Sequence, residues 1–544
     1  MADDLPEGYY LDNFTFLLDF VSRRYSDLLS ENEKQFHASF QALSPDSRKL
    51  FVRLTNRKGP YFRVDKLNYP EVASLGVEIR ALVAASFILP TIPDLDAAIK
   101  ICSKADLLRL EACADFPQST KKQVLADYLS SGQVNPVHEL TIEVVELAWA
   151  EELTVFKLLF FGNFHQDMTA FVMHELVAPF EQYEIDGNTG LFQRREVIDE
   201  LIVLQSLSDV SKQLMETEGC GLDLLQLVDN LPARNMEPVL SRRFDRIVNR
   251  IGRYLERADM IEEAVSVYCR AQATPARERQ ARILDRLGDP QAAMALCESI
   301  IETPLSEEEL EFAQRFGHRL AKKHQLKSGP EFNLPVQTIE QTIIQVACVD
   351  SSVELCARTY YQNLGYESYY VENSLMRSLF GLCFWDIIYA PVSGAFFNPF
   401  QRSPIDLYTP DFVDSRRVLI AGRFKALEKN GPRDLAMAIY RAKIGITNPF
   451  VNWMYVDEQL LEAALVKIPV QDLIRIFERL LIDLKNNSSG FPDLIVFDQN
   501  SYRMVEIKGP GDKLQKNQAR WFRYFQEQAI PAAVVNVEYL EVGT

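Results

Sequence analysis

Three charged residues near the end of the chain have the types and the spacing of a hydrolytic site. Asp493 precedes the β-rich run "LIVF", and Glu506 and Lys508 lie in a second such run, "YRMVEIK". The residues between the two runs include "QNS", which favours a tight turn, so we predict a β-hairpin. With the turn centred on this tripeptide, Asp493 would pair with Lys508, and Glu506 would lie two residues along on the same face.

The two acids indicate a metal site. Carboxylates this close repel each other, and one of them would have to be protonated unless a cation lies between them. Oxygen ligands suit a hard divalent cation, Mg²⁺ or Mn²⁺, and such an ion polarises a phosphoryl oxygen and lowers the pKa of its bound water. Lys508 could orient that water or offset negative charge in the transition state. We therefore predict Asp493 and Glu506 as metal ligands and Lys508 as the catalytic residue.

A third carboxylate could complete this site. Glu372 begins the run "ENSLMRSLFGLC", and helical spacing places it on the stripe of Leu375, Leu379 and Leu382. That face should be buried, so we predict Glu372 as a further metal ligand. The alternative is that Glu372 only complements the dipole at the start of a helix.

A basic helix is expected directly after Lys508. The run "GPGD" favours a tight turn, and Asp512 could cap a helix that carries Lys513 and Gln518. Basic and amide side chains beside the metal would contact the scissile phosphate and its neighbours. We predict Lys513 and Gln518 as DNA contacts.

A second group of basic residues lies in residues 48–70, "RKLFVRLTNRKGPYFRVDKLNYP", where aromatic residues are interleaved with them. This mixture suits a phosphate backbone with a base or sugar stacked nearby, although a solvated loop rim would have the same composition. The residues predicted to contact DNA here are Arg53, Arg57, Lys58, Arg63 and Lys66.

Residues 95–132 predict a pair of short helices. Ser103 could cap one helix, Pro117 interrupts the pattern, and Lys121 and Lys122 open the next helix. The spacing resembles a SAP domain, a small helical module that lies on DNA, although any helical hairpin would fit the pattern. We predict Lys121 and Lys122 as DNA contacts.

Residues 140–330 are almost all helix-forming and contain a weak repeat. The runs "RADMIEEAVSVY" and "RLGDPQAAMALC" align so that Ala264 matches Ala293. Small residues at matching positions are typical of stacked helix pairs, as in TPR-like solenoids.

One helix predicted within this region carries arginines on one face. The run "SRRFDRIVNRIGRYLER" repeats arginine every three or four residues. We interpret this stripe as facing a DNA duplex, and the alternative is an exposed face neutralised by glutamates elsewhere. The residues predicted to contact DNA are Arg242, Arg246 and Arg250.

The composition narrows the class of protein. A chain of 544 residues is too long for one core, and no apolar run approaches the roughly 20 residues of a membrane span. The cysteines form no CxxC and the histidines no HExxH, which argues against zinc. The net charge of −18 argues against non-specific coating of nucleic acid, so DNA contacts should be local patches. The acidic N-terminus does not look like a signal peptide, so we expect a cytoplasmic protein that is nucleoid-associated when on DNA.

The motif that runs from Pro492-Asp493 to "EIKGPGD" resembles the PD-(D/E)XK nucleases, and its continuation resembles their VRR-NUC branch. The runs "FGLCFWDIIY" and "SPIDLYTPDFVDSRR" are similar to segments of the Fanconi-associated nuclease family, and so are the basic segment and the SAP-like and TPR-like parts, in the same order. The resemblance covers nearly the whole chain and is to the shorter, microbial form. It implies a DNA nuclease that cuts 5′ flaps and trims 5′→3′ in interstrand crosslink repair.

The resemblance also implies roles for single residues. Gln518 would lie behind the metal ligands or contact a phosphate. Asn517 stands where the animal members have a lysine in their pocket for a 5′ phosphate, whereas Lys485 would keep positive charge there. The implied metal ligands are Glu372, Asp493, Glu506 and the carbonyl of Ile507, with Lys508 as the catalytic residue.

We therefore predict a multidomain chain that is mostly α-helical in its N-terminal two-thirds and ends in an α/β PD-(D/E)XK nuclease domain. The expected partner is branched DNA with a 5′ flap or 5′ end, bound by a monomer or weak dimer, and no membrane. The alternatives are a DNA-binding scaffold with an inactive nuclease-like domain, a junction resolvase, and a TPR adaptor that binds only proteins. The expected divisions are a helical DNA-binding region at 1–70, a SAP-like domain at 71–135, a TPR-like domain at 136–335 and the VRR-NUC domain at 340–544.

Overall fold

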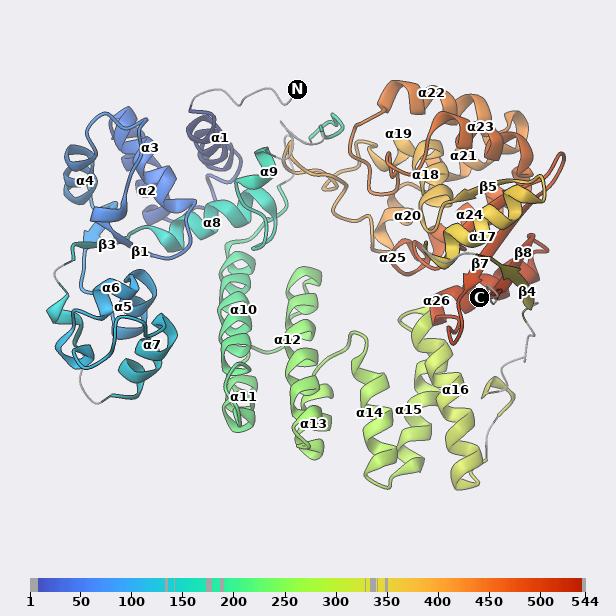
Figure 1. Ribbon diagram of the computed structural model, residues 1–544, viewed down its shortest axis with the longest axis horizontal. Helices are drawn as coiled ribbons and strands as arrows, with labels where there is room; N and C mark the ends of the chain where they lie inside the picture. Colours follow the sequence, from blue (N-terminus) through green and yellow to red (C-terminus); the bar gives the residue numbers. More distant parts are fainter. Residues whose placement is uncertain are drawn as a thin grey trace. The chain divides into compact units, whose positions relative to one another are not determined.

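The chain forms two compact units, each assembled from separate segments (Figure 1). Unit 1 contains Met1–Pro179, Ile185–Gln193 and Phe397–Phe400, and unit 2 contains Phe180–Glu184, Arg194–Phe396 and Gln401–Thr544. The expected boundaries at 70 and 135 fall inside unit 1, and the one at 335–340 falls inside unit 2, so the four-domain division stays a prediction. The computed structural model describes residues 8–132, 136–140, 142–172, 179–185, 190–327, 329–332, 339, 341–347 and 351–540. In these ranges no helix is long and apolar enough to cross a membrane.

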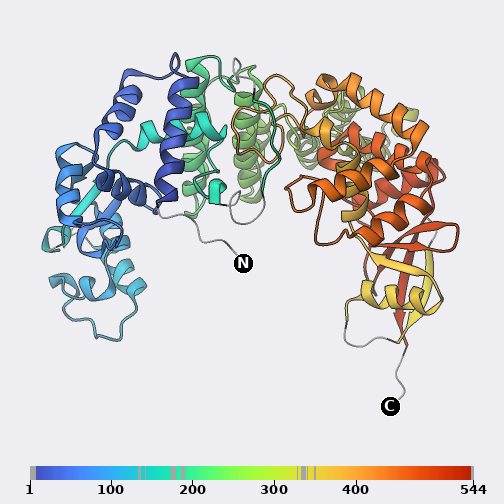
Figure 2. The same cartoon turned by 90° about the horizontal axis from the view of Figure 1, so that it is seen from above.

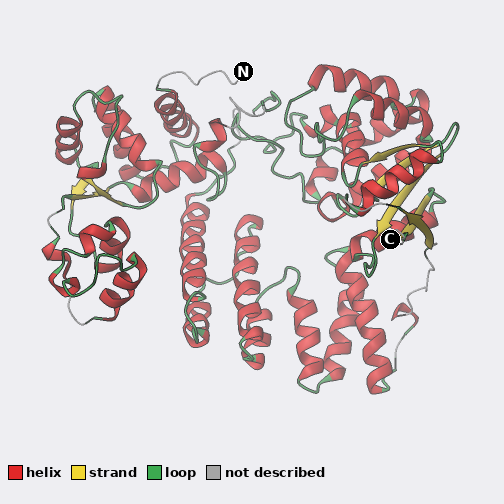
Figure 3. Ribbon diagram, viewed as in Figure 1, coloured by secondary structure: helices red, strands yellow, loops and turns green. Residues whose placement is uncertain are grey.

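Unit 1 packs helices around a small antiparallel sheet with strand order β1-β3-β2 (Figure 3). Phe36, Phe51 and Phe87 lie in its aromatic core, where the Phe51 and Phe87 ring centroids are 4.8 Å apart. The strands join distant parts of the sequence, since Phe62 pairs with Val145. The elements are α1 (Tyr9–Arg24), α2 (Glu31–Ala42), α3 (Pro45–Thr55), β1 (Tyr61–Arg63), α4 (Leu75–Ala84), β2 (Ile88–Pro90), β3 (Val144–Leu147), α8 (Ala150–Phe161) and α9 (Thr169–Val172).

The expected SAP-like helices lie within unit 1. They are α5 (Leu95–Ile101), α6 (Lys104–Leu107) and α7 (Lys122–Ser131). The Ser103 side chain accepts a hydrogen bond from the Asp106 amide and caps α6, as predicted. Leu107, Leu125 and Leu129 form the small core between these helices.

Unit 2 begins with helices that pack successively against one another, from α10 to α16. Ala264 on α13 and Ala293 on α15 are fully buried, which is the environment that the sequence repeat predicted for small residues. The helices are α10 (Arg195–Leu214), α11 (Gly221–Asp229), α12 (Pro238–Arg257), α13 (Ile261–Tyr268), α14 (Ala276–Arg286), α15 (Pro290–Glu302) and α16 (Glu307–His324).

A five-stranded mixed sheet organises the rest of unit 2, with order β4-β8-β7-β6-β5. Strands β5, β6 and β7 pair antiparallel, whereas β8 runs parallel to both β7 and β4. Figure 2 shows these strands together with the helix α17 (Val353–Asn363). The strands are β4 (Gln341–Val346), β5 (Glu367–Tyr370), β6 (Leu494–Phe497), β7 (Tyr502–Lys508) and β8 (Ala532–Tyr539).

Side-chain alternation divides this sheet into two faces. Val505 and Ile507 face α17, in a cluster with Cys356 and Ala357. Met504 faces the opposite helical layer, so Glu506 and Lys508 on the same strand point toward that layer as well. The helices there are α18 (Ser374–Cys383), α19 (Trp385–Ile388), α20 (Asp411–Ser415), α21 (Arg417–Asn430), α22 (Arg433–Lys443), α23 (Glu458–Lys467), α24 (Val470–Ile482), α25 (Leu484–Asn487) and α26 (Lys516–Glu527).

Short segments cross between the two units along the chain. In unit 2, the Tyr183 ring stacks on Phe396 at 3.9 Å, and Glu181 accepts a 2.7 Å hydrogen bond from the indole of Trp385. In unit 1, Phe400 packs 4.2 Å from Phe171. Each unit therefore takes part of its core from a segment distant in sequence.

Candidate active site

The hairpin of β6 and β7 carries the predicted acids, but its register differs from the prediction by two residues. Leu494 pairs with Val505, which places Asp493 opposite Glu506 and not opposite Lys508. The Asp498 amide donates to the Ser501 carbonyl at 3.0 Å, so the turn is centred one residue earlier than we predicted. Because two residues is one full side-chain period, all three charged residues still share one face.

Glu506, Lys508 and Gln518 contact one another on this face. Lys508 Nζ lies 2.7 Å from Glu506 Oε1 and donates to Gln518 Oε1 at 3.2 Å, and Gln518 Nε2 donates to Glu506 Oε1 at 2.6 Å. Gln518 lies in the first turn of α26, where Gln515 is the N-cap. The predicted cap Asp512 is wrong, because its carboxylate accepts from the Gly509 amide at 3.0 Å and closes the preceding turn instead.

The facing carboxylates are both difficult to ionise. Burial raises the pKa of Glu506 to about 7, with a further contribution from the negative charge of Asp493, while Lys508 opposes the shift. Burial also raises the pKa of Asp493 to about 6, although a hydrogen bond from the Ile507 amide at 2.8 Å favours its charged form. Glu506 Oε2 is buried and has no hydrogen-bond partner. The site thus has one ammonium for a buried and a half-buried acid, and one carboxylate oxygen has no partner.

Glu372 lies next to this pair but not on a helix. Helix α18 starts at Ser374, so the helical stripe that we predicted for Glu372 is wrong. Glu372 has a φ of 34°, which is strained for a residue with a side chain, and its amide donates to the Asp493 carbonyl at 2.9 Å. Its carboxylate accepts a hydrogen bond from Tyr370 at 2.7 Å. The backbone thus brings Glu372 to Asp493, while Tyr370 holds its carboxylate.

Comparison with known proteins identifies the family. Residues 8–89 match the family described as FAN1, HTH domain, and residues 428–539 match the VRR-NUC domain. A Fanconi-associated nuclease 1 homolog from Pseudomonas aeruginosa is 33% identical over 559 residues, which cover 98% of this chain and 97% of that protein. The chain belongs to the Fanconi-associated nuclease family. Fanconi-associated nuclease 1 from Homo sapiens is 24% identical over 97% of this chain and 62% of its own length.

Solved structures are similar over the same extent. The crystal structure of paFAN1 bound to 2nt 5′flap DNA with gap has a TM-score of 0.91 and 32% identity, covering 99% of this chain and all of that one. As a Fanconi-associated nuclease, this protein is a structure-specific DNA nuclease, and its VRR-NUC domain implies that it depends on a divalent metal ion. This confirms the fold class and the enzymatic activity that the sequence predicted, and it rules out an inactive scaffold or a protein-only adaptor.

The residues present fit the divalent ion that the family implies. Across the described residues, no three His, Cys, Asp or Glu side chains already converge as ligands. The buried Oε2 of Glu506, however, lacks a partner, and Asp493 lies opposite it with a raised pKa. A cation would satisfy both, because it supplies the missing ligand and lets both acids ionise.

A further acid beside the site was missed by the sequence analysis. Glu354, in the first turn of α17, contributes to the raised pKa of Asp493 through its negative charge. An acid at a helix start is common for dipole reasons alone, so its spacing gave no signal. With Glu354 included, this Fanconi-associated nuclease concentrates more negative charge around Asp493 than the hairpin alone carries.

Asn373 was missed too, although it fixes the approach to Asp493. Its Oδ1 accepts hydrogen bonds from the Gly490 amide at 2.7 Å and the Phe491 amide at 3.1 Å. Gly490 has a φ of 96°, and a Cβ there would lie 2.8 Å from the Asn517 backbone. Glycine thus allows the start of α26 to pack against the loop that Asn373 holds.

Two of the predicted DNA contacts in residues 48–70 are engaged within unit 1. Arg63 is buried and pairs with Asp65 at 2.7 Å and with Asp106, so its assignment as a DNA contact is wrong. The hydrogen bond to Asp65 holds the pKa of Arg63 above its usual range. Arg53 bonds to Glu71 at 2.6 Å and lies over the Tyr10 ring. Arg57, Lys58, Lys66 and Lys121 are exposed, while Lys122 is half-buried.

The arginine stripe on α12 divides in the same way. Arg242 and Arg246 are exposed, and neither forms an ion pair with any residue that the structure describes. Arg250 instead donates to Ser208 and Ser211 of α10, at 3.0 Å and 2.6 Å between the side chains, and joins the two helices. The assignment of Arg242 and Arg246 as DNA contacts therefore stays a prediction, whereas Arg250 is engaged between α10 and α12.

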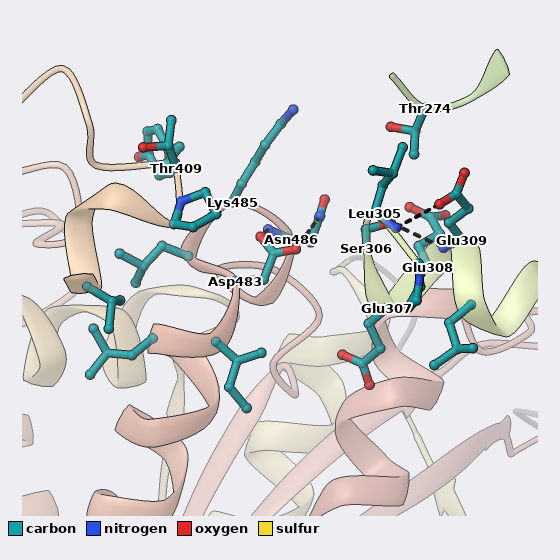
Figure 4. Close-up of a pocket in the computed structure, with 18 of the residues that line it drawn as sticks. Thr274, Leu305, Ser306, Glu307, Glu308, Glu309, Thr409, Asp483, Lys485 and Asn486 are labelled. Atoms are coloured by element: carbon teal, nitrogen blue, oxygen red, sulfur yellow. Dashed lines mark hydrogen bonds between the residues drawn. The ribbon is translucent and has the colours of Figure 1, made fainter. Parts of the chain in front are cut away.

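Lys485 and Lys513 are exposed, and Lys485 stands at an acidic cavity of about 660 Å³ (Figure 4). In this view Glu307, Glu308 and Glu309 lie on one side and Lys485 lies with Asn486 on the other. Acidic side chains repel a phosphate backbone. A second, smaller cavity of about 350 Å³ has Lys485, Lys516 and Arg520 in its lining, and it is better suited to DNA.

Proposed function

We propose that this nuclease cuts DNA at or near a 5′ flap and trims 5′→3′ during interstrand crosslink repair, with Mg²⁺ or Mn²⁺ as its metal. The protein would act on the bacterial nucleoid as a monomer or weak dimer. The observation that carries the proposal is the set of half-buried Asp493 with buried Glu506 and Lys508, in which one Glu506 oxygen has no partner. The similarity to a protein solved with 5′-flap DNA supports the choice of substrate.

The metal would be held by oxygen atoms. Asp493, Oε2 of Glu506 and the carbonyl of Ile507 are the proposed ligands, and Glu372 would join them when its carboxylate leaves Tyr370. Oxygen ligands favour Mg²⁺ or Mn²⁺ over zinc. When bound, the ion supplies a Lewis acid for the phosphate and a more acidic water.

Lys508 and Gln518 complete the proposed mechanism. Both bind Oε1 of Glu506, which leaves Oε2 for the metal. The Lys508 ammonium would offset negative charge on the phosphate in the transition state and orient the attacking water. Gln518 keeps Lys508 in place through a 3.2 Å hydrogen bond and so acts as a positioning residue.

A panel of labelled substrates tests the function. Wild type should cut 5′ flaps about tenfold or more faster than nicks, forks and four-way junctions, a preference of about 1.4 kcal/mol or more in transition-state binding. EDTA should stop the reaction, and Mg²⁺ or Mn²⁺ should restore it. Asp493→Ala should be inactive on every substrate. Faster, symmetrical cutting of junctions would instead support a resolvase.

The exposed arginines of α12 should contribute to duplex binding. Burial lowers the pKa of the neighbouring Arg243, and the charge of Arg246 adds to this effect, as expected in a positive patch. The double change Arg242→Ala with Arg246→Ala should lower the slope of log K against log salt by about two. Fluorescence anisotropy at several salt concentrations measures this slope.

Arg250→Ala is the matched control for that experiment. It removes the same charge from the same helix, but Arg250 binds Ser208 and Ser211. It should leave the slope nearly unchanged and lower the free energy of unfolding by about 1–3 kcal/mol. Equal slopes for wild type and the double variant would show that Arg242 and Arg246 do not contact phosphates.

A further inference from the structure

An aromatic and cationic groove lies on α16, outside the active site. It encloses about 520 Å³, a volume within the usual range for ligand pockets. The Phe312 and Phe316 rings at its base stack with centroids 5.2 Å apart and planes 19° apart. The chain carries a net charge of −18, yet four cationic side chains gather here. The lining includes Arg282, Phe312, Arg315, Phe316, Arg319 and Lys516.

Two arginines of the groove lie over its aromatic rings. The guanidinium carbon of Arg282 is 4.7 Å from the Phe312 centroid, and that of Arg319 is 5.2 Å from the Phe316 centroid. The rings themselves are nearly buried, so the guanidinium groups present the outer surface. A planar guanidinium held in this way can stack on a base with its free face and bond a phosphate with its edge.

Arg319 is available for such contacts. Arg282 pairs with Glu278 at 2.9 Å and Arg315 pairs with Glu311 at 2.6 Å, whereas Arg319 is exposed and has no ion pair with any residue in the described ranges. Lys516 is also exposed and has no ion pair in the described ranges, so the groove offers two unpaired cations beside two that are held in position.

The groove lies close to the active site within unit 2. One end of helix α16 lies near α26 (Figure 1), where Glu311 forms a 2.7 Å ion pair with Arg523. Lys516 lines both this groove and the cavity that contains Lys485. Two residues further along α26 is Gln518, which bonds to Glu506. The groove and the basic cavity therefore share Lys516, which lies on the same helix as Gln518.

We propose that the α16 groove binds an unpaired nucleotide of the flap strand, with the base on Arg282 and Arg319 and a phosphate on Arg319 and Lys516. This inference rests on the proposed function, because it assigns part of the same substrate. The groove is large enough for a nucleotide and too small for a duplex, whose major groove alone is about 12 Å wide. A free nucleotide shares this chemistry, and the experiment below separates the two sources.

The test measures how binding depends on flap length. Anisotropy titrations use nicked DNA with flaps of zero, one, two and four nucleotides. EDTA is present in order to prevent cleavage. Wild type should bind the longer flaps about 5- to 100-fold more tightly than the nick, as one or two stacked bases provide. Arg319→Ala should lose most of that gain and should bind the nick as wild type does. Arg286→Ala, which removes an exposed charge whose partner is Asp259, is the control and should keep the gain.

The outcomes distinguish the inference from the function on which it rests. If wild type cuts flaps and Arg319→Ala shows the wild-type dependence on flap length, the inference is overturned and the function stands. If wild type cuts no flap, the proposed function itself fails. Addition of millimolar dTMP should not weaken flap binding by wild type, and displacement of the flap by dTMP would assign the groove to a free nucleotide instead.

Discussion

Replacing Lys508 with alanine should reduce DNA cleavage by about 10³-fold and leave flap binding nearly unchanged. The ammonium lies 2.7 Å from Glu506 and is almost buried, so it acts in a place where charge is poorly screened. Single-turnover cleavage of a labelled flap measures the loss, and anisotropy in EDTA measures binding.

Two controls protect this result from a folding artefact. Lys429→Ala removes an exposed lysine from α21 in the same unit and should cut like wild type. Lys508→Gln keeps a hydrogen-bonding side chain, shorter by one atom, without the charge, and it should be as inactive as Lys508→Ala. Cleavage within tenfold of wild type by either Lys508 variant would remove Lys508 from the mechanism.

Glu506→Gln should abolish cleavage and make the metal-free protein more stable. Glu506 is 1% exposed, and burial and Asp493 raise its pKa to about 7. Ionised Glu506 therefore lowers the free energy of unfolding of the metal-free protein. Glutamine keeps the shape without the charge, so the free energy of unfolding at pH 8 should rise by about 1–3 kcal/mol. Thermal denaturation in EDTA measures this change, and the flap assay measures activity.

The pH dependence of the free energy of unfolding provides a second test of the Glu506→Gln prediction. The pKa values of Glu506 and Asp493 are raised above 4.5 and 3.8, their usual values, so the folded state holds these protons more tightly than the unfolded state. Their stabilising contribution is complete below about pH 4 and is lost as the pH rises through 6 to 7. Metal-free wild type should therefore lose stability between pH 5 and pH 8, and Glu506→Gln should lose less.

Divalent metal should reverse this loss. Mg²⁺ or Mn²⁺ binds the ionised carboxylates, so it should raise the melting temperature of wild type more at pH 8 than at pH 6. The shift should be absent in Glu506→Gln and normal in Glu428→Gln, an exposed change on α21. A metal shift of equal size in Glu506→Gln would place the ion elsewhere.

The catalytic hairpin could be predicted because its signals are local. Alternating apolar residues, a turn signal and acids within one short stretch define two strands and the face that carries the charges. The register could not be fixed in the same way, because it depends on whether Asp498 and Ser501 close the turn. The predicted register was wrong by an even number of residues, so the charged side chains still lie on the same face of the hairpin.

Residues that reach the site from other segments could not be predicted. Asn373 bonds to the loop at Gly490, 117 residues away, and no periodicity reports such a contact. Arg63 gave the opposite error, because its basic neighbours suggested DNA while its partner Asp106 lies 43 residues further along. The neighbouring residues in the sequence indicate which chemistry a side chain could perform. They do not indicate its contact partner, because that depends on how distant segments pack.

The crossing segments of the two units limit how this protein can be dissected. A truncation that begins at Arg194 would remove Glu181 and Tyr183, and the Trp385 indole would lose its acceptor while Phe396 lost its stacking ring. The same fragment would retain Phe400, whose contact with Phe171 lies in the deleted part. No single cut in the chain separates the units, so biochemical work on the nuclease half alone requires either the intact polypeptide or a redesigned junction at both crossings.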